Sequence, residues 1–393
     1  MKPIAISRFT ATTALGAGTA PTLEAMRQKR SGLKRAHFRD VELPGWIGVV
    51  EGVDEVRLPT GLDAYDCRNN RLAWLGLQQD GLLDAVDSAR RRWGATRIAL
   101  ILGTSTSGQL QTELAYRRRA ADGSLPADFH YAQTQNTFSV AAFVAQALAL
   151  RGPSWVVSTA CSSSAKVFAS AARLLATGLV DAALVGGVDS LCLTTLYGFN
   201  SLELLSPDIC RPWDAQRHGL SLGEGAAFAL LERDCALPLG WLLGTGESSD
   251  GHHMSSPHPQ GLGAVEAMRA ALADASLEPA AIDYINLHGT ATPNNDSAED
   301  NAVQAVFGRA TPCSSTKGAT GHTLGAAGAV EAAISLLALR HGLMPAGLNS
   351  LTPDPALKTN YLRHTYVAPL RTVLSNSFGF GGSNASLVFG ACR

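Results

Sequence analysis

Short apolar runs alternate along the chain with longer runs that are rich in alanine. The apolar runs predict buried strands at residues 98–102, 155–158, 182–185, 226–231, 282–286 and 386–389. The alanine-rich runs predict helices at residues 139–150, 162–177, 264–275, 298–307 and 326–340. Because strands that alternate with helices build parallel sheets covered on both faces, the pattern predicts a largely parallel α/β fold.

The two halves of the chain carry similar motifs. In the first half the turn TACSSS opens a small-residue helix, and the later segment GEGAAFALLE joins a glycine-rich turn to a strand. In the second half KGATGHTLG opens a similar helix, and GFGGSNASLVFG again joins glycines to a strand. This repeat predicts a duplicated unit with halves at residues 1–240 and 241–393, and a site between them would draw residues from both.

Composition narrows the class of protein. The 393 residues are 46% hydrophobic and 17% charged, which favours a large buried core and excludes a disordered chain. The net charge of −1 gives no overall positive charge that would indicate binding to nucleic acid or to an anionic membrane. The seven cysteines are spread singly, without the spacing of a metal site or a disulfide framework. With no convincing signal peptide or membrane span, we expect a soluble cytoplasmic protein with reduced thiols and no metal.

Cys161 is the strongest candidate nucleophile. It lies in VVSTACSSSAKVF, where a predicted strand runs into a tight turn and a helix begins. The positive end of a helix favours the thiolate, which is the nucleophilic form of cysteine. The alternative is a buried, unreactive cysteine, and the local pattern alone does not decide between the two. The other six cysteines lack this setting, and we expect them to be inert.

Two histidines also follow or precede glycine-rich turns. His288 stands in YINLHGTATP, just after a predicted strand, and His322 stands in KGATGHTLGAAG, just before a predicted helix. Lys317 and Glu331 flank His322 and could orient its ring through an ion pair. In isolation each of these residues also fits a loop or surface role. The turn SNSFGFGGSN could present backbone N–H groups to a ligand and lacks the spacing of a dinucleotide fingerprint.

Together, ACSSS, HGTATP, GHTLGAAG and NSFGFGGSNASLVF closely resemble the elongating β-ketoacyl-acyl-carrier-protein synthases of the thiolase-like superfamily. The resemblance covers nearly the whole chain. It implies a duplicated five-layer α/β/α/β/α sandwich that is usually dimeric. It also implies an acyltransferase that joins an acyl-cysteine intermediate to malonyl-acyl-carrier protein by decarboxylative Claisen condensation, as in fatty-acid elongation.

The resemblance assigns a catalytic role to five residues. Cys161 matches the acylated nucleophile. His288 and His322 match the two histidines that support decarboxylation, where neutral imidazole N–H groups stabilise an enolate. Lys317 and Glu331 match the pair that supports those histidines.

Further residues match positions that contact the substrate. The backbone N–H groups of the nucleophile and of Phe380 match the oxyanion donors, and the Phe380 ring matches the gate of the acyl pocket. Thr290 and Thr292 match threonines that contact the phosphopantetheine arm of the carrier protein. Phe199 and Thr106 fall at positions that line the acyl tunnel. The resemblance implies no bound cofactor, because the carrier's own arm brings the substrate.

Some positions depart from the family pattern. The usual HGTSTP is HGTATP here, His218 and Leu220 replace a common Asp and Phe, and Thr106 replaces a common Ile or Gly. These departures raise an alternative, a ketosynthase of a specialised polyene or polyketide pathway such as aryl polyene synthesis. Fatty-acid elongation stays the favoured interpretation, because the active site does not specify the pathway. Some such pathways pair the ketosynthase with a chain-length partner that lacks the cysteine, and this chain would then be the catalytic half.

The partner expected from the resemblance is an acidic acyl carrier protein, bound by a homodimer or a ketosynthase-like heterodimer. Arginine-rich segments that could dock a carrier lie at residues 27–35, 90–92 and 117–119, although any one of them could be a solvated face. Three rival classes remain: a thiolase, a Cys–His hydrolase and a non-enzymatic chain-length partner. A thiolase needs a second cysteine near the C-terminus, where only Cys392 is found, beyond the last predicted strand.

Overall fold

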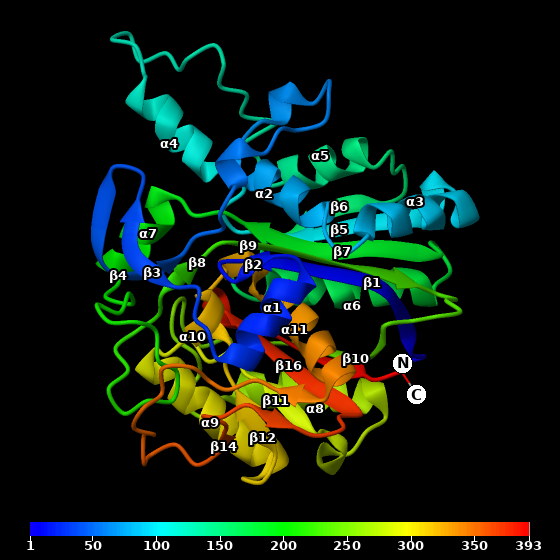
Figure 1. Ribbon diagram of the computed structural model, residues 1–393, viewed down its shortest axis with the longest axis vertical. Coiled ribbons are helices and arrows are strands. Elements are labelled where there is room, and N and C mark those ends of the chain that lie inside the picture. The colour runs from blue at the N-terminus through cyan, green and yellow to red at the C-terminus, as the bar shows by residue number, and fades with distance from the viewer. Residues whose placement is uncertain (393) are drawn as a thin grey trace.

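The computed structural model describes residues 1–392, and most of its strands form two joined sheets of matching order (Figure 1). In the first sheet the order is β1 (Ile4–Thr13), β9 (Gly225–Glu232), β7 (Ala182–Asp189), β5 (Ile98–Gly103) and β6 (Ser154–Val157). In the second it is β10 (Gly240–Ser249), β17 (Ser383–Gly390), β16 (Thr372–Gly379), β11 (Tyr284–Asn286), β12 (Pro312–Ser314) and β14 (Asn360–Tyr361). Antiparallel pairing of β1 with β10 joins the two sheets, as a duplicated unit predicts.

The prediction of a largely parallel sheet holds only for the outer strands of each half. β5 runs parallel to β6 and β7, and β11 runs parallel to β12 and β16. The inner strands β1, β9, β10 and β17 pair antiparallel, which corrects the prediction. In the second half the reason is local: only Phe380–Gly382 connect β16 to β17, and a link this short permits a hairpin but no parallel crossover.

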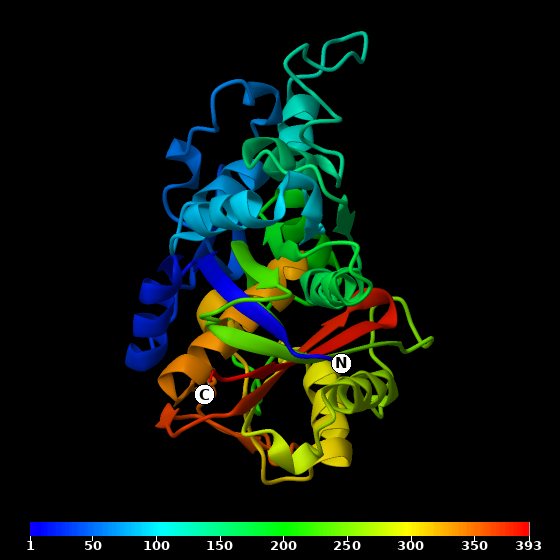
Figure 2. The same ribbon diagram turned by 90° about the vertical axis from the view of Figure 1, so that its right-hand side faces the viewer.

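Helices complete five layers, which confirms the predicted sandwich (Figures 1 and 2). The outer face of the first sheet is covered by α2 (Arg68–Leu77), α3 (Leu82–Trp93) and α5 (Ser139–Ala147). Between the sheets lie α6 (Ser163–Ala176) and α11 (Ala327–His341). The outer face of the second sheet is covered by α8 (Leu262–Ala275) and α9 (Pro293–Phe307).

The central helix α11 is the most deeply buried element. Every residue from Ala327 to Leu339 is buried, mostly by alanine and leucine packing against both sheets. The stretch Leu324–His341 is long and apolar enough to cross a membrane, but 89% of it lies inside the protein. Its apolar character therefore reflects its place in the core rather than a membrane span.

All strands and helices predicted from the sequence are present, with shifts at their ends. The largest shift is in α9, which begins at Pro293 rather than at 298 because Thr292 and Pro293 form a helix start. Smaller elements are α1 (Thr19–Gln28), β3 (Lys34–Phe38), β4 (Val41–Gly48) and α7 (Leu193–Ser201). The division after residue 240 falls at the first residue of β10 and stays a prediction.

Candidate active site

The turn between β6 and α6 holds Cys161 in a tightly packed position. Ala160, just before it, has a left-handed backbone (φ +51°), and Cys161 itself is buried. Gly379 packs against this turn so closely that an added Cβ would lie 2.7 Å from the carbonyl oxygen of Thr159. This approach brings the backbone N–H of Phe380 into a hydrogen bond with the Cys161 sulfur. The C-terminal hairpin therefore supplies a donor at the nucleophile.

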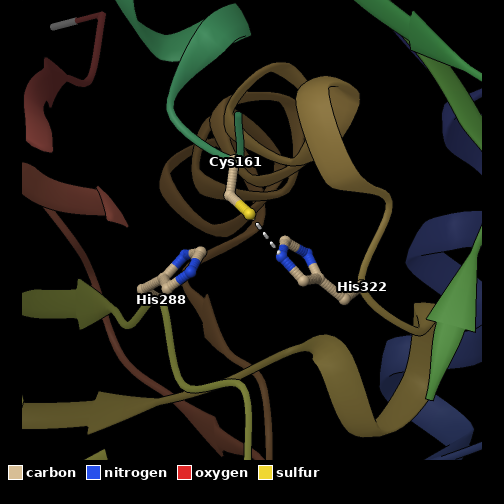
Figure 3. Close-up of side chains that lie close together, drawn as sticks. All are labelled: Cys161, His288 and His322. Carbon is tan, nitrogen blue, oxygen red and sulfur yellow. Dashed lines mark hydrogen bonds between the residues drawn. The ribbon is translucent and has the colours of Figure 1, made fainter. Parts of the chain in front are cut away.

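Both histidines converge on this sulfur from the other half of the chain (Figure 3). Nε2 of His322 lies 2.9 Å from Sγ of Cys161, within hydrogen-bond distance. The His288 and His322 rings are 5.3 Å apart and nearly perpendicular. The sulfur and one nitrogen of each ring all lie within 4.8 Å of one another, so a single small thioester can contact all three groups.

The protonation state of the sulfur differs from the expectation drawn from its helix-start position. Burial raises the pKa of the Cys161 thiol to about 12, and the opposing effects of the Lys317 charge and the Phe380 N–H are smaller. The prediction that Cys161 is a thiolate is therefore wrong, and the sulfur is protonated at physiological pH. In the tautomer of His322 that carries its proton on Nδ1, Nε2 accepts the thiol proton across this 2.9 Å contact, and that imidazole can then act as the base for nucleophilic attack.

Both imidazoles are neutral at physiological pH. Burial, together with the nearby positive charge of Lys317, holds the pKa of His288 and of His322 well below the usual value. Nζ of Lys317 lies 3.4 Å from Nδ1 of His288. Because an ammonium group only donates, Nδ1 accepts and the ring proton is carried by Nε2. His288 is thereby fixed as a hydrogen-bond donor.

Lys317 and Glu331 form a buried ion pair behind the histidines. The lysine ammonium contacts a Glu331 carboxylate oxygen and also donates to the carbonyl oxygen of His288. Burial raises the pKa of Glu331 to about 7. Lys317 therefore contacts His288 directly, and Glu331 acts on it only through Lys317. This corrects the expectation that the pair orients the His322 ring, because within residues 1–392 that ring is hydrogen-bonded to Cys161 and to neither member of the pair.

A cavity of about 340 Å³ opens onto the sulfur and both imidazoles. Its lining combines an apolar set, Phe199, Leu202, Leu204, Leu220, Phe378 and Phe380, with a polar set that includes Thr290, Thr292, Asn294 and Asn295. The rings of Phe199 and Phe380 stack with their centroids 5.7 Å apart, and the hydroxyl oxygens of the two threonines lie 2.9 Å from each other. The apolar part suits an acyl chain and the polar part suits a pantetheine arm.

Thr106 does not line this cavity. Its backbone N–H and its hydroxyl both donate to the buried carboxylate of Asp189, at 2.9 and 3.0 Å. Only 4% of the residue is exposed. The structure therefore separates Thr106 from the other tunnel positions expected from the sequence, because a buried acceptor on the neighbouring strand holds it away.

Glu299 is a site residue that the sequence analysis missed. It is buried on α9 and accepts the backbone N–H groups of His288 (2.8 Å) and Gly289 (2.7 Å). Asp296, one turn earlier on α9, accepts the N–H of Ala291 at 3.1 Å. Acidic residues three apart at the start of a helix, directly after the HGTATP loop, were the available signal, since they share one helix face.

The charge of Glu299 makes stability depend on pH. Burial raises its pKa from 4.5 to about 7, so the folded state keeps a proton that the unfolded state has already lost. The protonated carboxyl stabilises the folded state fully below pH 4.5, and this stabilisation is lost as the pH rises to about 7. Over that range the free energy of unfolding falls by about 3 kcal/mol. Because burial raises the pKa of Glu331 to about 7 as well, Glu299→Gln should weaken the pH dependence of thermal unfolding without abolishing it, and an unchanged profile would contradict the prediction.

Comparison with known proteins identifies the family. The N-terminal domain model of β-ketoacyl synthases matches residues 67–236, and the C-terminal domain model matches residues 239–350. Nodulation protein E of Rhizobium meliloti (strain 1021) is 34% identical over 95% of this chain and 96% of its own. The chain belongs to the β-ketoacyl synthase family. It is an acyltransferase with the condensing activity of 3-oxoacyl-acyl-carrier-protein synthases.

Two further relatives of this ketoacyl synthase bear on its role. The 3-oxoacyl-[acyl-carrier-protein] synthase 2 of Coxiella burnetii is 33% identical over 77% of the chain and 80% of its own. A solved complex of a ketosynthase with its chain length factor from Xenorhabdus doucetiae matches with a TM-score of 0.91 and 39% identity, over 99% of this chain and 98% of that one.

The remaining cysteines argue against a thiolase. Within residues 1–392, Cys161 is the only cysteine that lines the cavity. Cys392 is exposed, and its sulfur contacts the carbonyl oxygen of Pro238 at the surface. A ketoacyl synthase with one site cysteine and two site histidines has no second thiol with which to carry out thiolase chemistry.

Proposed function

We propose that this ketosynthase extends an acyl chain held on Cys161 with a malonyl unit delivered by an acyl carrier protein. The observation that carries the proposal is the convergence of one thiol and two neutral imidazoles on a single cavity. The proposal needs no bound cofactor. The phosphopantetheine arm of the carrier would lie along Thr290 and Thr292, whose hydroxyls face the same cavity.

In the first half-reaction Sγ of Cys161 attacks the carbonyl carbon of an acyl thioester. The thiol proton passes to Nε2 of His322 and then to the sulfur of the departing carrier, so the step is balanced without any external proton. The tetrahedral oxyanion would be held by the backbone N–H groups of Cys161 and Phe380. The product is acyl-Cys161 and a free carrier thiol.

In the second half-reaction the malonyl thioester loses carbon dioxide. The electrons of the broken C–C bond pass to the thioester oxygen, where Nε2–H of His288 and the ring of His322 donate hydrogen bonds to the enolate. His322 can change its role because no protein group within residues 1–392 is hydrogen-bonded to its Nδ1, so the protein holds the ring in neither tautomer. The enolate carbon then attacks acyl-Cys161, and the released sulfur takes up one proton from water.

We further propose that the pathway is specialised and that the chain works with a chain-length partner. The support is that a ketosynthase–chain length factor complex and a nodulation protein both align over 95% or more of the chain. Fatty-acid elongation, which the sequence analysis favoured, is the second candidate, supported by the Coxiella relative. We also propose a cytoplasmic location, supported by seven free thiols within residues 1–392.

Co-expression separates these two pathways. The chain would be purified alone and together with a ketosynthase-like chain of its source organism that lacks the nucleophile, and both preparations assayed with acyl- and malonyl-carrier protein. We expect a one-to-one complex and condensation by the complex only. A homodimer that elongates acyl-carrier substrates at the same rate without the second chain would instead support fatty-acid elongation.

The arginine-rich segment at residues 27–35 is the proposed docking site for the carrier. The segments 90–92 and 117–119 are less suitable, because Arg90 and Arg91 pair with Asp87, and Arg117 with Asp40. In contrast Arg35 is exposed and stacks over the Trp46 ring, and it has no carboxylate partner within residues 1–392.

The same segment also lies next to the pantetheine loop. Leu33 packs in one cluster with Ala291, which lies between the two threonines proposed to contact the pantetheine arm. Basic side chains at this position would meet an acidic carrier as its arm enters the cavity.

Charge reversal tests this docking site. Arg35→Glu should raise KM for acyl-carrier protein by roughly tenfold and weaken its dependence on salt, because rim charges act through long-range attraction. KM for an acyl-pantetheine mimic should stay unchanged, since the mimic has no acidic surface. Arg91→Glu, on the segment paired with Asp87, is the matched control and should leave both constants unaltered. Equal effects of Arg35→Glu on the two substrates would exclude docking there.

A further inference from the structure

A buried carboxylate that the reaction steps do not use lies beside the site. Asp189 is the last residue of β7, and none of its surface is exposed. Leaving a carboxylate in the core costs free energy unless several donors reach it. Here the donors are backbone N–H groups and hydroxyls that come from two separate loops. These loops supply the hydrogen bonds that the buried carboxylate needs, and the carboxylate in turn links the two loops.

The first loop is Thr104–Thr106, which follows β5. Oδ1 of Asp189 accepts the hydroxyl of Thr104 at 2.6 Å and the backbone N–H of Ser105 at 2.8 Å. The N–H and hydroxyl of Thr106 add two more bonds to the same oxygen. From this loop the Ser105 hydroxyl reaches the carbonyl oxygen of Ala160 at 3.4 Å, directly before the nucleophile.

The second loop is the turn that follows His322. Oδ2 of Asp189 accepts the backbone N–H of Gly325 at 2.6 Å. An added Cβ on Gly325 would lie 2.8 Å from that oxygen and 2.8 Å from the backbone nitrogen of Ser105. Only glycine permits this approach, which sets the start of α11 and the position of His322 three residues earlier.

We propose that Asp189 is a positioning residue whose carboxylate ties the Thr104–Thr106 loop to the turn after His322 and so fixes the hydrogen bond between His322 and Cys161. The proposal rests on the proposed function, in which the hydrogen bond between His322 and Cys161 removes the thiol proton during acyl transfer. Since nucleophile activation depends on a short, aligned contact, loosening either loop should slow acyl transfer far more than it weakens carrier binding.

Asp189 also acts on the thiol through its charge. The negative charges of Asp189 and Glu331 raise the pKa of Cys161, whereas the positive charge of Lys317 lowers it. Both imidazoles that face the sulfur are neutral. Removing the charge of Asp189 should therefore make the thiol more acidic, an effect that a purely structural residue would not produce.

The experiment compares Asp189→Asn with Asp300→Asn. Asp300 is an equally buried carboxylate that accepts two backbone N–H groups, those of Lys358 and Thr359, away from the site. Each variant is assayed for thermal unfolding, for condensation kinetics, and for the pH profile of Cys161 alkylation by iodoacetamide. Alkylation needs no carrier protein or malonyl substrate, so it tests Asp189 even if the proposed function were wrong.

We expect both variants to unfold at lower temperature. Only Asp189→Asn should lower kcat for condensation by about 10²-fold with KM unchanged, and only it should move the alkylation midpoint to lower pH. Wild-type kinetics and a wild-type alkylation profile in Asp189→Asn, or equal losses in Asp300→Asn, would overturn the proposal. If Asp189→Asn does not fold, Thr104→Val removes a single donor and should lower kcat in the same way, and wild-type kcat in that variant would overturn the proposal.

Discussion

Replacing Cys161 with alanine should abolish acyl transfer and condensation while sparing decarboxylation of malonyl-carrier protein. The sulfur is the only thiol that lines the cavity within residues 1–392, so no other thiol there can carry the acyl group. Loss of a covalent nucleophile costs at least about 10⁴-fold in rate in comparable enzymes. The enolate donors lie on the histidines and stay in place. This variant should therefore still release labelled carbon dioxide from malonyl-carrier protein but form no 3-oxoacyl-carrier product.

Cys210→Ala provides the matched control. Cys210 is also buried, and its sulfur lies 3.8 Å from the carbonyl oxygen of Thr290, but it does not line the cavity. Its replacement should leave acylation intact. Acyl transfer at the wild-type rate in Cys161→Ala would show that another residue carries the acyl group.

Replacing His288 with alanine should remove decarboxylation and leave acylation of Cys161 intact. The Lys317 ammonium fixes the His288 ring as a donor, and the hydrogen bond to the sulfur belongs to His322 instead. Loss of one preorganised donor to a developing oxyanion costs roughly 10²–10³-fold. Single-turnover acylation and carbon dioxide release, measured on the same preparation, should show this split.

The corresponding change at His322 should behave differently. His322→Ala removes the base that takes the thiol proton as well as a donor to the enolate, so both half-reactions should slow. His218→Ala, at an exposed position outside the cavity lining, should change neither. Equal loss of acylation and decarboxylation in His288→Ala would contradict the assignment of separate tasks to the two histidines.

Much of this site could be predicted from the sequence, because each functional residue lies at the end of a strand or the start of a helix that the apolar pattern reveals. Cys161 follows β6 and precedes α6, His288 follows β11, and His322 comes shortly before α11. The duplicated motifs predicted that these ends come from both halves, and the pairing of β1 with β10 joins the halves in one body.

Other features could not be predicted because they depend on burial in three dimensions. The helix-start position of Cys161 suggested a thiolate, but desolvation outweighs the favourable local charges and raises the pKa of the thiol. Thr106 was expected in the acyl tunnel, but Asp189, distant in sequence, holds it elsewhere. Glu299 carries only the weak signal of its spacing from Asp296, and its contacts with the His288 loop appear only when α9 packs against β11.

Mass spectrometry of Cys161 tests the central claim most directly. The purified chain, with its partner where one is required, would be incubated with an acyl-carrier thioester, digested and analysed, and malonyl-carrier protein then added. The account predicts that the peptide containing Cys161 gains the mass of the acyl group. It further predicts that this mass leaves the peptide on addition of malonyl-carrier protein and is recovered as 3-oxoacyl-carrier product. Acylation of a different residue, or release of the acyl group as free acid, would contradict it.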